Sequence, residues 1–146
     1  MHITGQCHCG NVAYTLDWEG EPAQIPSRTC GCTFCAKHGA TWTSRPEAKL
    51  AVTIADPANI TKYEFGTKTA TFHVCARCGV PVFVTCTMND RAYAVVNVNT
   101  FDNVDASRII RVPASFDGED VGSRLARRER NWIADVRIDG GHPAAP

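Results

Sequence analysis

The sequence predicts a mainly β fold, built from folded antiparallel sheets, for this chain of 146 residues. Its regular segments are short, rich in Val, Thr, Ile and aromatic residues, and bounded by Gly, Pro, Asn or Asp. Turn signals such as Asp56-Pro57 and Asn89-Asp90 recur along the chain, which is typical of a meander or a folded pair of sheets. A helical pattern is scarce before the C-terminal part.

The expected strands follow one another from the N-terminal part of the chain to its middle. Tyr63 and Phe65 flank Glu64, for example, in the alternation that a strand imposes on its two faces. Near the C-terminus, residues 119–133 place apolar side chains among charged ones, a pattern that favours an amphipathic helix. The predicted strands span residues 12–18, 40–43, 50–54, 61–65, 70–73, 80–85 and 93–98.

Composition restricts the domain count and the class of partner. The chain has 15 Lys and Arg against 15 Asp and Glu, so its formal net charge is zero. A protein that neutralises nucleic-acid phosphates usually carries a basic excess, so the balance disfavours a nucleic-acid partner. The length and the 44% of hydrophobic residues suit one core. We therefore expect a single domain over residues 1–139 and a loose tail at residues 140–146, which has little to bury.

The N-terminal residues and the apolar stretches bear on the compartment. Residues 1–7 show no basic patch followed by an apolar run, so we expect no secretory signal. The longest apolar stretches have the length of strands and fall short of a membrane span. We therefore expect a cytoplasmic protein with no membrane partner. Thiols stay reduced in that compartment, so closely spaced cysteines are expected to be metal ligands or catalytic groups rather than disulfides.

Seven of the eight cysteines fall into three tight groups, CHC at residues 7–9, CGCTFC at 30–35 and CARC at 75–78. A Cys-x-x-Cys turn followed by Gly points both sulfurs at one centre, and Zn²⁺ favours four thiolates in a tetrahedron. Cys75 and Cys78 therefore need a second pair, which Cys7 and Cys9 supply most naturally because the middle group then stays intact. Pairing Cys75 and Cys78 with two of the middle cysteines is the alternative, since spacing alone does not determine connectivity.

The middle group, Cys30, Cys32 and Cys35, offers three thiolates within six residues. Three protein ligands plus one exchangeable position are typical of a reactive zinc site. Zinc in such a site lowers the pKa of a bound thiol or water and holds it as the anion. One alternative is a metal-free thiol cluster. Another is a structural site whose fourth ligand is His38, His73 or Cys86.

Three blocks of the chain stand in a characteristic order and spacing: GQCHCGNVAY at residues 5–14, CGCTFC at 30–35 and CARCGVPVF at 75–83. Together they resemble the glutathione-dependent formaldehyde-activating enzyme family, over roughly residues 3–100. The resemblance implies the Mss4-like fold, with antiparallel sheets tied by a four-cysteine zinc site. It also implies a structural zinc on the outer cysteines, which are Cys7, Cys9, Cys75 and Cys78. The middle cysteines, Cys30, Cys32 and Cys35, would hold a labile, catalytic zinc.

The family resemblance further implies carbon–sulfur lyase chemistry at Cys30, Cys32 and Cys35. The reaction joins glutathione, a small-molecule thiol, to formaldehyde and gives S-hydroxymethylglutathione. The alternative, from another functional class, is a non-catalytic zinc-binding interaction module with two structural zincs. A nucleic-acid-binding zinc ribbon is disfavoured by the neutral charge.

Cationic side chains are expected near a site that recognises the two carboxylates of glutathione. Lys37, Arg45 and Arg77 lie close in sequence to the cysteine groups and are candidates, although each is also typical of solvated surface. The arginines of residues 124–130 are interspersed with acidic residues nearby. This charge pattern predicts a solvated helix face rather than a nucleic-acid patch.

Overall fold

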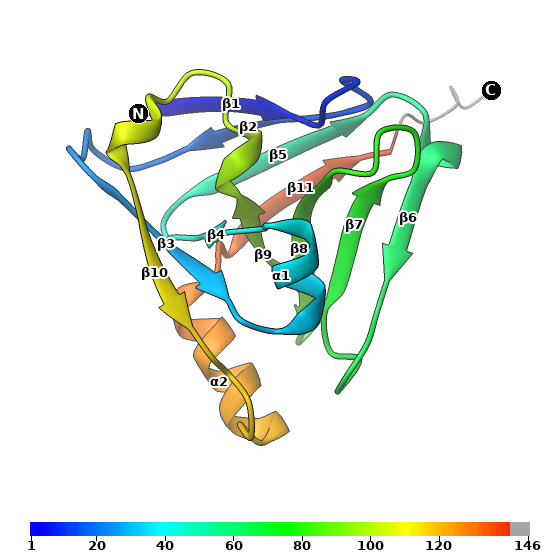
Figure 1. The fold of residues 1–146 in the computed structure, drawn as a ribbon, viewed down its shortest axis with the longest axis vertical. Helices are drawn as coiled ribbons and strands as arrows, with labels where there is room; N and C mark the ends of the chain where they lie inside the picture. Colours follow the sequence, from blue (N-terminus) through cyan, green and yellow to red (C-terminus); the bar gives the residue numbers. More distant parts are fainter. Residues whose placement is uncertain (141–146) are drawn as a thin grey trace.

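The computed structural model describes residues 1–140 and confirms the mainly β fold (Figure 1). The tail expected at residues 140–146 lies outside the described residues, apart from Gly140. Among the residues described, no helix combines the length and apolar character that crossing a membrane requires.

The smaller sheet has four strands: β1 (His2–Gln6), β2 (Val12–Asp17), β5 (Lys49–Ile54) and β11 (Asp135–Asp139), in the order β1-β2-β5-β11. In β2, Val12, Tyr14 and Leu16 alternate with more exposed residues, so one face of the strand is buried. The β1–β2 and β2–β5 pairs are antiparallel, whereas β11 is parallel to β5.

The larger sheet has seven strands in the order β10-β3-β4-β9-β8-β7-β6. Their bounds are β3 (Ile25–Cys30), β4 (Trp42–Thr43), β6 (Ile60–Tyr63), β7 (Thr71–Cys75), β8 (Pro81–Met88), β9 (Arg91–Asn97) and β10 (Ile109–Ala114). All of its pairs are antiparallel except β10 with β3.

Within residues 1–140, two α-helices accompany the sheets, α1 (Thr33–His38) and α2 (Val121–Asn131). Asp120 caps α2, since its carboxylate accepts a hydrogen bond from the Ser123 backbone N–H at 2.7 Å. The helix predicted over residues 119–133 is thus confirmed with slightly shorter bounds. Three single 3₁₀ turns are η1 (Pro57–Asn59), η2 (Val98–Thr100) and η3 (Ala106–Arg108).

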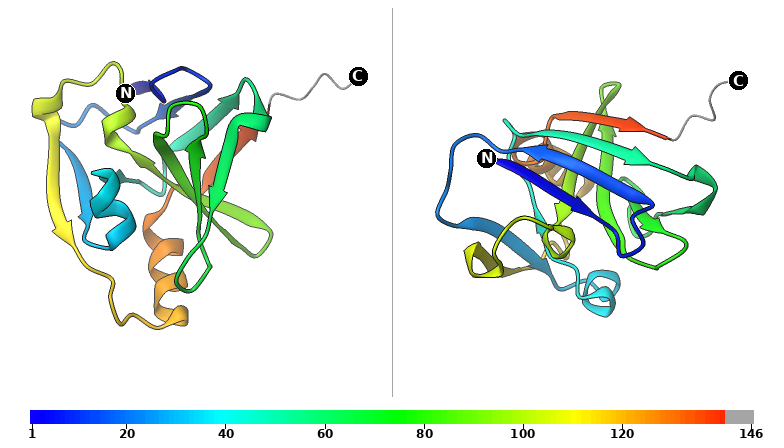
Figure 2. Two further views of the ribbon diagram at one scale, coloured as in Figure 1. Left: turned by 45° about the vertical axis from the view of Figure 1, so that its right-hand side comes forward. Right: turned by 90° about the horizontal axis from the view of Figure 1, so that it is seen from above.

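The main hydrophobic core lies between the two sheets. Seen from above, β1, β2, β5 and β11 run side by side as one layer across the strands of the larger sheet (Figure 2). Leu16 and Val52 from the small sheet share this core with Phe83 and Val96 from the large one. Burial of these side chains stabilises the contact between the sheets and places their connecting turns next to one another.

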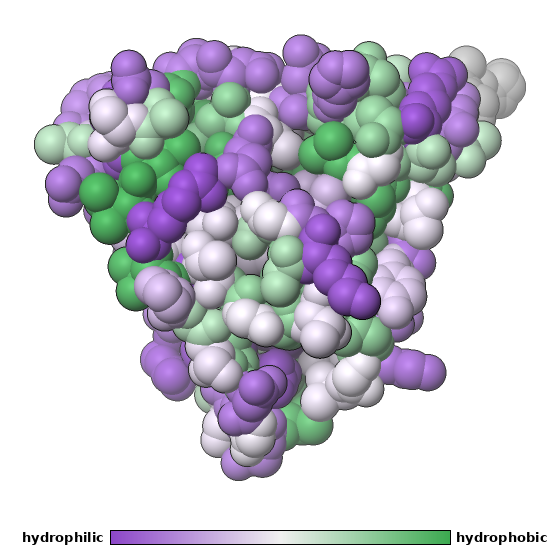
Figure 3. All heavy atoms as spheres, viewed as in Figure 1, coloured by the Kyte–Doolittle hydropathy of each residue, from purple (hydrophilic) through white to green (hydrophobic). Residues whose placement is uncertain are grey.

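Four strands and one helix were not expected from the sequence: β1, β3, β10, β11 and α1. Both parallel pairs involve edge strands from the C-terminal part, β10 and β11. These strands are mostly exposed, and β10 contains Pro113, so neither shows the alternating pattern of a half-buried strand. Figure 3 shows hydrophobic residues gathered along β10, where Val112 is 52% exposed.

Candidate metal centres and active-site cavity

The first cysteine cluster joins turns from the two sheets. Cys7 and Cys9 lie in the turn between β1 and β2, Cys75 ends β7, and Cys78 lies in the turn from β7 to β8. The four Sγ atoms all lie within 4.8 Å of one another. Cys9 Sγ is 3.7 Å from Cys7 Sγ and 3.5 Å from Cys75 Sγ. The structure thus brings together the two pairs that the spacing favoured.

The two turns have similar local geometry. The Cys7 N–H donates to the Val12 carbonyl at 2.9 Å, and the Cys75 N–H donates to the Val80 carbonyl at 3.0 Å. Each turn includes a glycine with positive φ, +85° at Gly10 and +79° at Gly79. Residues with a Cβ rarely adopt this conformation. These glycines let each turn fold back tightly, so that its two sulfurs approach the same point.

The four sulfurs fit a tetrahedral zinc ion. With zinc–sulfur bonds of about 2.3 Å, adjacent sulfurs of a tetrahedron lie about 3.8 Å apart, close to the separations found here. Burial raises the pKa of the Cys7 thiol to about 11, so thiolates at this depth need a cation to compensate their charge. The cluster could hold one zinc with all four positions filled, which suits a structural tie between the sheets.

The second cluster forms where β3 turns into α1. Cys30 is the last residue of β3, Cys32 caps the helix, and Cys35 is a buried residue of α1 that is 2% exposed. The Cys32 Sγ accepts a hydrogen bond from the Cys35 N–H at 3.4 Å. Because one strand end and one helical turn carry all three residues, their Sγ atoms lie within 4.8 Å of one another.

The thiols of this cluster differ in acidity. Hydrogen bonding with the Cys35 thiol lowers the pKa of Cys30 to about 5, while the same contact raises the pKa of Cys35. The indole Nε1–H of Trp42 also donates to Cys35 Sγ, at 3.3 Å. A thiol with a lowered pKa is readily available as a thiolate, the form that binds metals and attacks electrophiles.

No fourth ligand completes this cluster among residues 1–140. No other His, Cys, Asp or Glu atom joins the three sulfurs in a group within 4.8 Å. His38 packs on Phe34, with ring centroids 4.5 Å apart. His73 contacts Thr85 through Nε2 at 2.8 Å, and Cys86 Sγ is 3.5 Å from Arg128 Nη1. The three cysteines could therefore hold a zinc ion with one position left for another ligand.

A cavity of about 280 Å³ opens beside the three cysteines, all of which line it. Part of its wall is aromatic, with side chains from five separate elements or loops. Trp42 is 5% exposed and also lines the cavity. The aromatic lining residues are Trp42, Phe65, Phe72, Phe116 and Trp132.

The cations that line the cavity are not those proposed from sequence proximity. Arg45 pairs with Glu47 at 3.4 Å and Arg77 with Asp56 at 3.5 Å, and neither lines the cavity. Lys37 is exposed on α1. The basic residues that lie close to the cysteines in sequence therefore do not line the cavity. The arginines in the cavity wall are Arg28, Arg124, Arg127 and Arg128.

The solvated helix face predicted for residues 124–130 is therefore wrong for three of its four arginines. Arg128 is only 6% exposed, and Arg124 and Arg127 are largely buried. Arg130 is exposed, as expected. The sequence feature that could have revealed these cavity arginines is the i, i+3, i+4 spacing of Arg124, Arg127 and Arg128. This spacing places them on one face of a helix. Only the fold directs that face toward the cysteines.

Comparisons with known proteins identify a similar structure and a matching family. The chain matches a crystal structure of a Rhodobacter sphaeroides protein, a structural genomics target, with 32% identity and a TM-score of 0.57. The match covers 75% of this chain and 97% of that one. A sequence model described as glutathione-dependent formaldehyde-activating enzyme matches residues 2–113. The Mss4-like, mainly β fold expected for that family is the fold class described above. The chain therefore belongs to the glutathione-dependent formaldehyde-activating enzyme family.

Proposed function

We propose that this chain is a zinc-dependent carbon–sulfur lyase acting on a thiol adduct, with glutathione and formaldehyde as the first substrates to test. The observation that carries the proposal is the position of Cys30, Cys32 and Cys35 in the wall of a cavity, with no fourth protein ligand among the described residues. A purely structural site would have four protein ligands.

In the proposed reaction, the thiol sulfur forms a bond to the aldehyde carbon while the carbonyl π bond breaks. The proton lost by the thiol ends on the new hydroxyl, so the reaction needs no oxidant or reductant. A zinc ion bound to the three cysteines would supply Lewis acidity to a thiol or carbonyl. The chain's own contribution is to hold the two reactants side by side in a small cavity, which removes the entropic cost of their encounter.

We further propose different roles for the two clusters. Cys7, Cys9, Cys75 and Cys78 would hold a structural zinc between the two sheets, and Cys30, Cys32 and Cys35 would hold a labile, catalytic one. None of the eight cysteines forms a disulfide, which is typical of a reducing compartment. We therefore place the protein in the cytoplasm, acting as one domain over residues 1–139.

Exchange NMR with formaldehyde and glutathione, with the zinc-loaded and the zinc-free protein, tests the proposal. The zinc-loaded protein should exchange free and adducted glutathione faster than the uncatalysed background does. Removing zinc should return the rate to background. A rate that never exceeds background would refute the lyase and favour the alternative, an interaction module with two structural zincs. The zinc-bound fold would stand in either case.

A further inference from the structure

Three arginines of α2 face the same cavity as the middle cysteines, although α2 lies outside the residues matched by the family model. That match ends at residue 113, and α2 begins at Val121. Arg124, Arg127 and Arg128 nevertheless line the cavity together with Cys30, Cys32 and Cys35. The C-terminal segment therefore contributes a wall to the candidate active site.

Arg128 carries a buried charge that lacks a carboxylate partner in the described chain. Its Nη1 donates to Thr69 Oγ1 at 2.9 Å, and its guanidinium lies 5.0 Å from the centre of the Trp132 ring. Its buried Nε has no hydrogen-bond partner within residues 1–140. Burying a cation without a compensating anion is costly. Arg128 is thus arranged to receive an anion from outside the chain.

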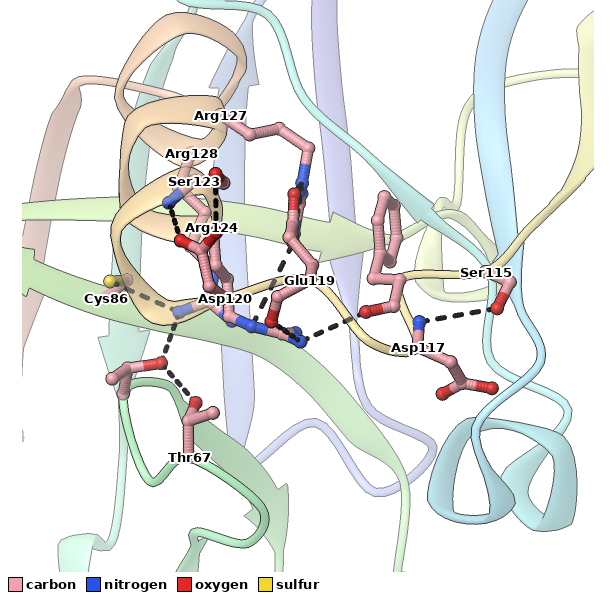
Figure 4. Close-up of polar contacts among 12 residues, drawn as sticks. Thr67, Cys86, Ser115, Asp117, Glu119, Asp120, Ser123, Arg124, Arg127 and Arg128 are labelled. Carbon is pink, nitrogen blue, oxygen red and sulfur yellow. Dashed lines mark hydrogen bonds and ion pairs between the residues drawn. The ribbon is translucent and has the colours of Figure 1, made fainter.

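Arg124, like Arg128, has a buried Nε–H group that donates no hydrogen bond among the described residues, whereas the Nε and Nη2 groups of Arg127 donate to Glu119 (Figure 4). Arg127 donates to both carboxylate oxygens of Glu119 at 3.0 Å and stacks 3.8 Å above the Phe116 ring. Arg124 donates to the backbone carbonyls of Phe116 and Glu119, at 3.1 and 3.4 Å. Its buried Nε has no hydrogen-bond partner in the described part of the chain, although it forms a long ion pair with a Glu119 carboxylate oxygen at 3.9 Å.

Arg28 adds a fourth guanidinium to the cavity wall. It comes from β3, which is distant from α2 in the sequence. Its Nη2 donates to Ser44 Oγ at 3.0 Å, and no carboxylate pairs with it among the described residues. Burial lowers the pKa of both Arg28 and Arg128, which reflects the same uncompensated desolvation. Asp117 is the lining carboxylate that opposes these charges. The cavity wall therefore has a positive excess.

Much of the remaining wall is apolar, with Thr67 and Ser115 as polar exceptions, and the cavity is small. Phe72, Val84 and Val95 line it beside Trp42. Its volume of about 280 Å³ lies just below the range of roughly 300–1,000 Å³ that is typical of sites for drug-sized ligands. The ligand, or the part of a larger thiol such as glutathione, that fits both walls is compact, with an apolar portion and one anionic group.

We propose that this cavity recognises a compact organic carboxylate, whose apolar body packs on Trp42 and Phe72 and whose carboxylate binds Arg124, Arg128 and Arg28. The inference rests on the proposed function in one respect: this carboxylate belongs to the thiol that reacts beside the three cysteines. The α2 segment then determines which thiol is accepted, because planar guanidinium groups match the geometry of a carboxylate.

Calorimetric titration of the zinc-loaded protein with 3-phenylpropanoate tests the cavity without any thiol chemistry. The neutral amide, 3-phenylpropanamide, has nearly the same shape and should bind at least about tenfold more weakly, because it lacks the charge-assisted hydrogen bonds. Equal binding of the two ligands, or no binding of either, would overturn the inference.

Variants on two faces of the same helix locate the site. Arg124→Gln should weaken 3-phenylpropanoate binding by about tenfold or more, whereas Arg130→Gln, on the exposed face of α2, should leave it unchanged. Arg28→Gln tests the same site from β3 and should produce a similar loss, so a folding failure of either variant leaves the other to decide. Equal effects of Arg124→Gln and Arg130→Gln would contradict the proposed site.

The same ligand separates this inference from the proposed function. If 3-phenylpropanoate binds through Arg124 but no adduct exchange exceeds background, the cavity assignment stands and the lyase fails. If exchange is catalysed and 3-phenylpropanoate neither binds nor inhibits it, the lyase stands and the carboxylate site fails. When both hold, 3-phenylpropanoate should inhibit exchange in competition with the thiol.

Discussion

The indole Nε1–H of Trp42 donates to the Sγ of Cys35 at 3.3 Å, and both side chains are almost fully buried. Trp42 comes from β4, whereas Cys35 lies in α1. This hydrogen bond therefore fixes the most buried sulfur of the cluster against the larger sheet. A donor to a ligand sulfur also stabilises its thiolate form, and such outer contacts orient metal ligands.

Trp42→Phe should weaken zinc binding by the middle cluster, because phenylalanine keeps an aromatic ring but lacks the donor. Loss of an outer contact of this kind typically costs about 10- to 100-fold in metal affinity. Competition with a chromophoric chelator measures the change. The matched control is Trp18→Phe, since Trp18 is also buried and its Nε1 has no partner in the described residues. Equal zinc loss in both variants would show that the hydrogen bond is unimportant.

Cys32→Ser and Cys78→Ser should differ in their effect on the fold. Cys32 caps a six-residue helix beside the cavity, so its replacement should abolish adduct exchange and leave the circular dichroism spectrum unchanged. Cys78 belongs to the cluster that joins the two sheets, so its loss should unfold the protein, because structural zinc contributes folding free energy. Similar unfolding by both variants would refute the division of roles.

The zinc-loaded protein should release its two metals at very different rates. The outer cluster has four protein ligands, two of them the buried Cys7 and Cys75, whereas the middle one opens to a cavity. A mild chelator or excess glutathione should therefore remove about one zinc per chain quickly and leave the other, as measured by elemental analysis after desalting. Two equally inert zincs would contradict the labile assignment.

The pairing of Glu119 with Arg127 predicts a pH dependence of stability. Hydrogen bonding from Arg127 holds the pKa of Glu119 below its ordinary value of 4.5. The folded state thus favours the carboxylate, so its stabilisation is present above about pH 4.5 and is lost as the pH falls through the lower folded pKa.

Denaturant unfolding of Glu119→Gln and of the unmodified chain at a series of pH values checks this dependence. The variant should be less stable near pH 7, by about 1 kcal/mol or less, and the difference should disappear in acid. The control is Glu129→Gln, an exposed residue of the same helix, which should show little difference at any pH. A difference that persists unchanged in strong acid would exclude Glu119 ionisation as its source.

Much of the metal chemistry was predictable from local sequence. The three groups of cysteines lie within turns or at the start of a helix, where a few residues determine where their sulfurs point. Cys-x-x-Cys turns such as Cys75 to Cys78 bring their own two sulfurs together with little help from the rest of the chain. The strands with alternating apolar residues, such as β2 and β5, were predictable because burial of one face leaves a period of two.

The edge strands and the cationic wall were not predictable in this way. β10 and β11 are held by backbone hydrogen bonds to β3 and β5, and such bonds leave no side-chain pattern. The charged helix pattern of residues 124–130 was compatible with a solvated surface because Glu119 and other acidic residues lie nearby in sequence. Glu119 accepts two short hydrogen bonds from Arg127, whereas Arg124 reaches it only in an ion pair at 3.9 Å.

By itself, then, the sequence determined the β class, the seven cysteines that could bind metal and the family to which the chain belongs. Tertiary structure alone decided that Arg124 and Arg128 line the same cavity as Cys30, which lies 94 and 98 residues earlier in the chain. The physical reason is that a cysteine turn is a local arrangement, whereas a cavity wall depends on how distant elements pack together. Packing places α2 against the larger sheet, and that placement converts a charged helix face into part of a binding site.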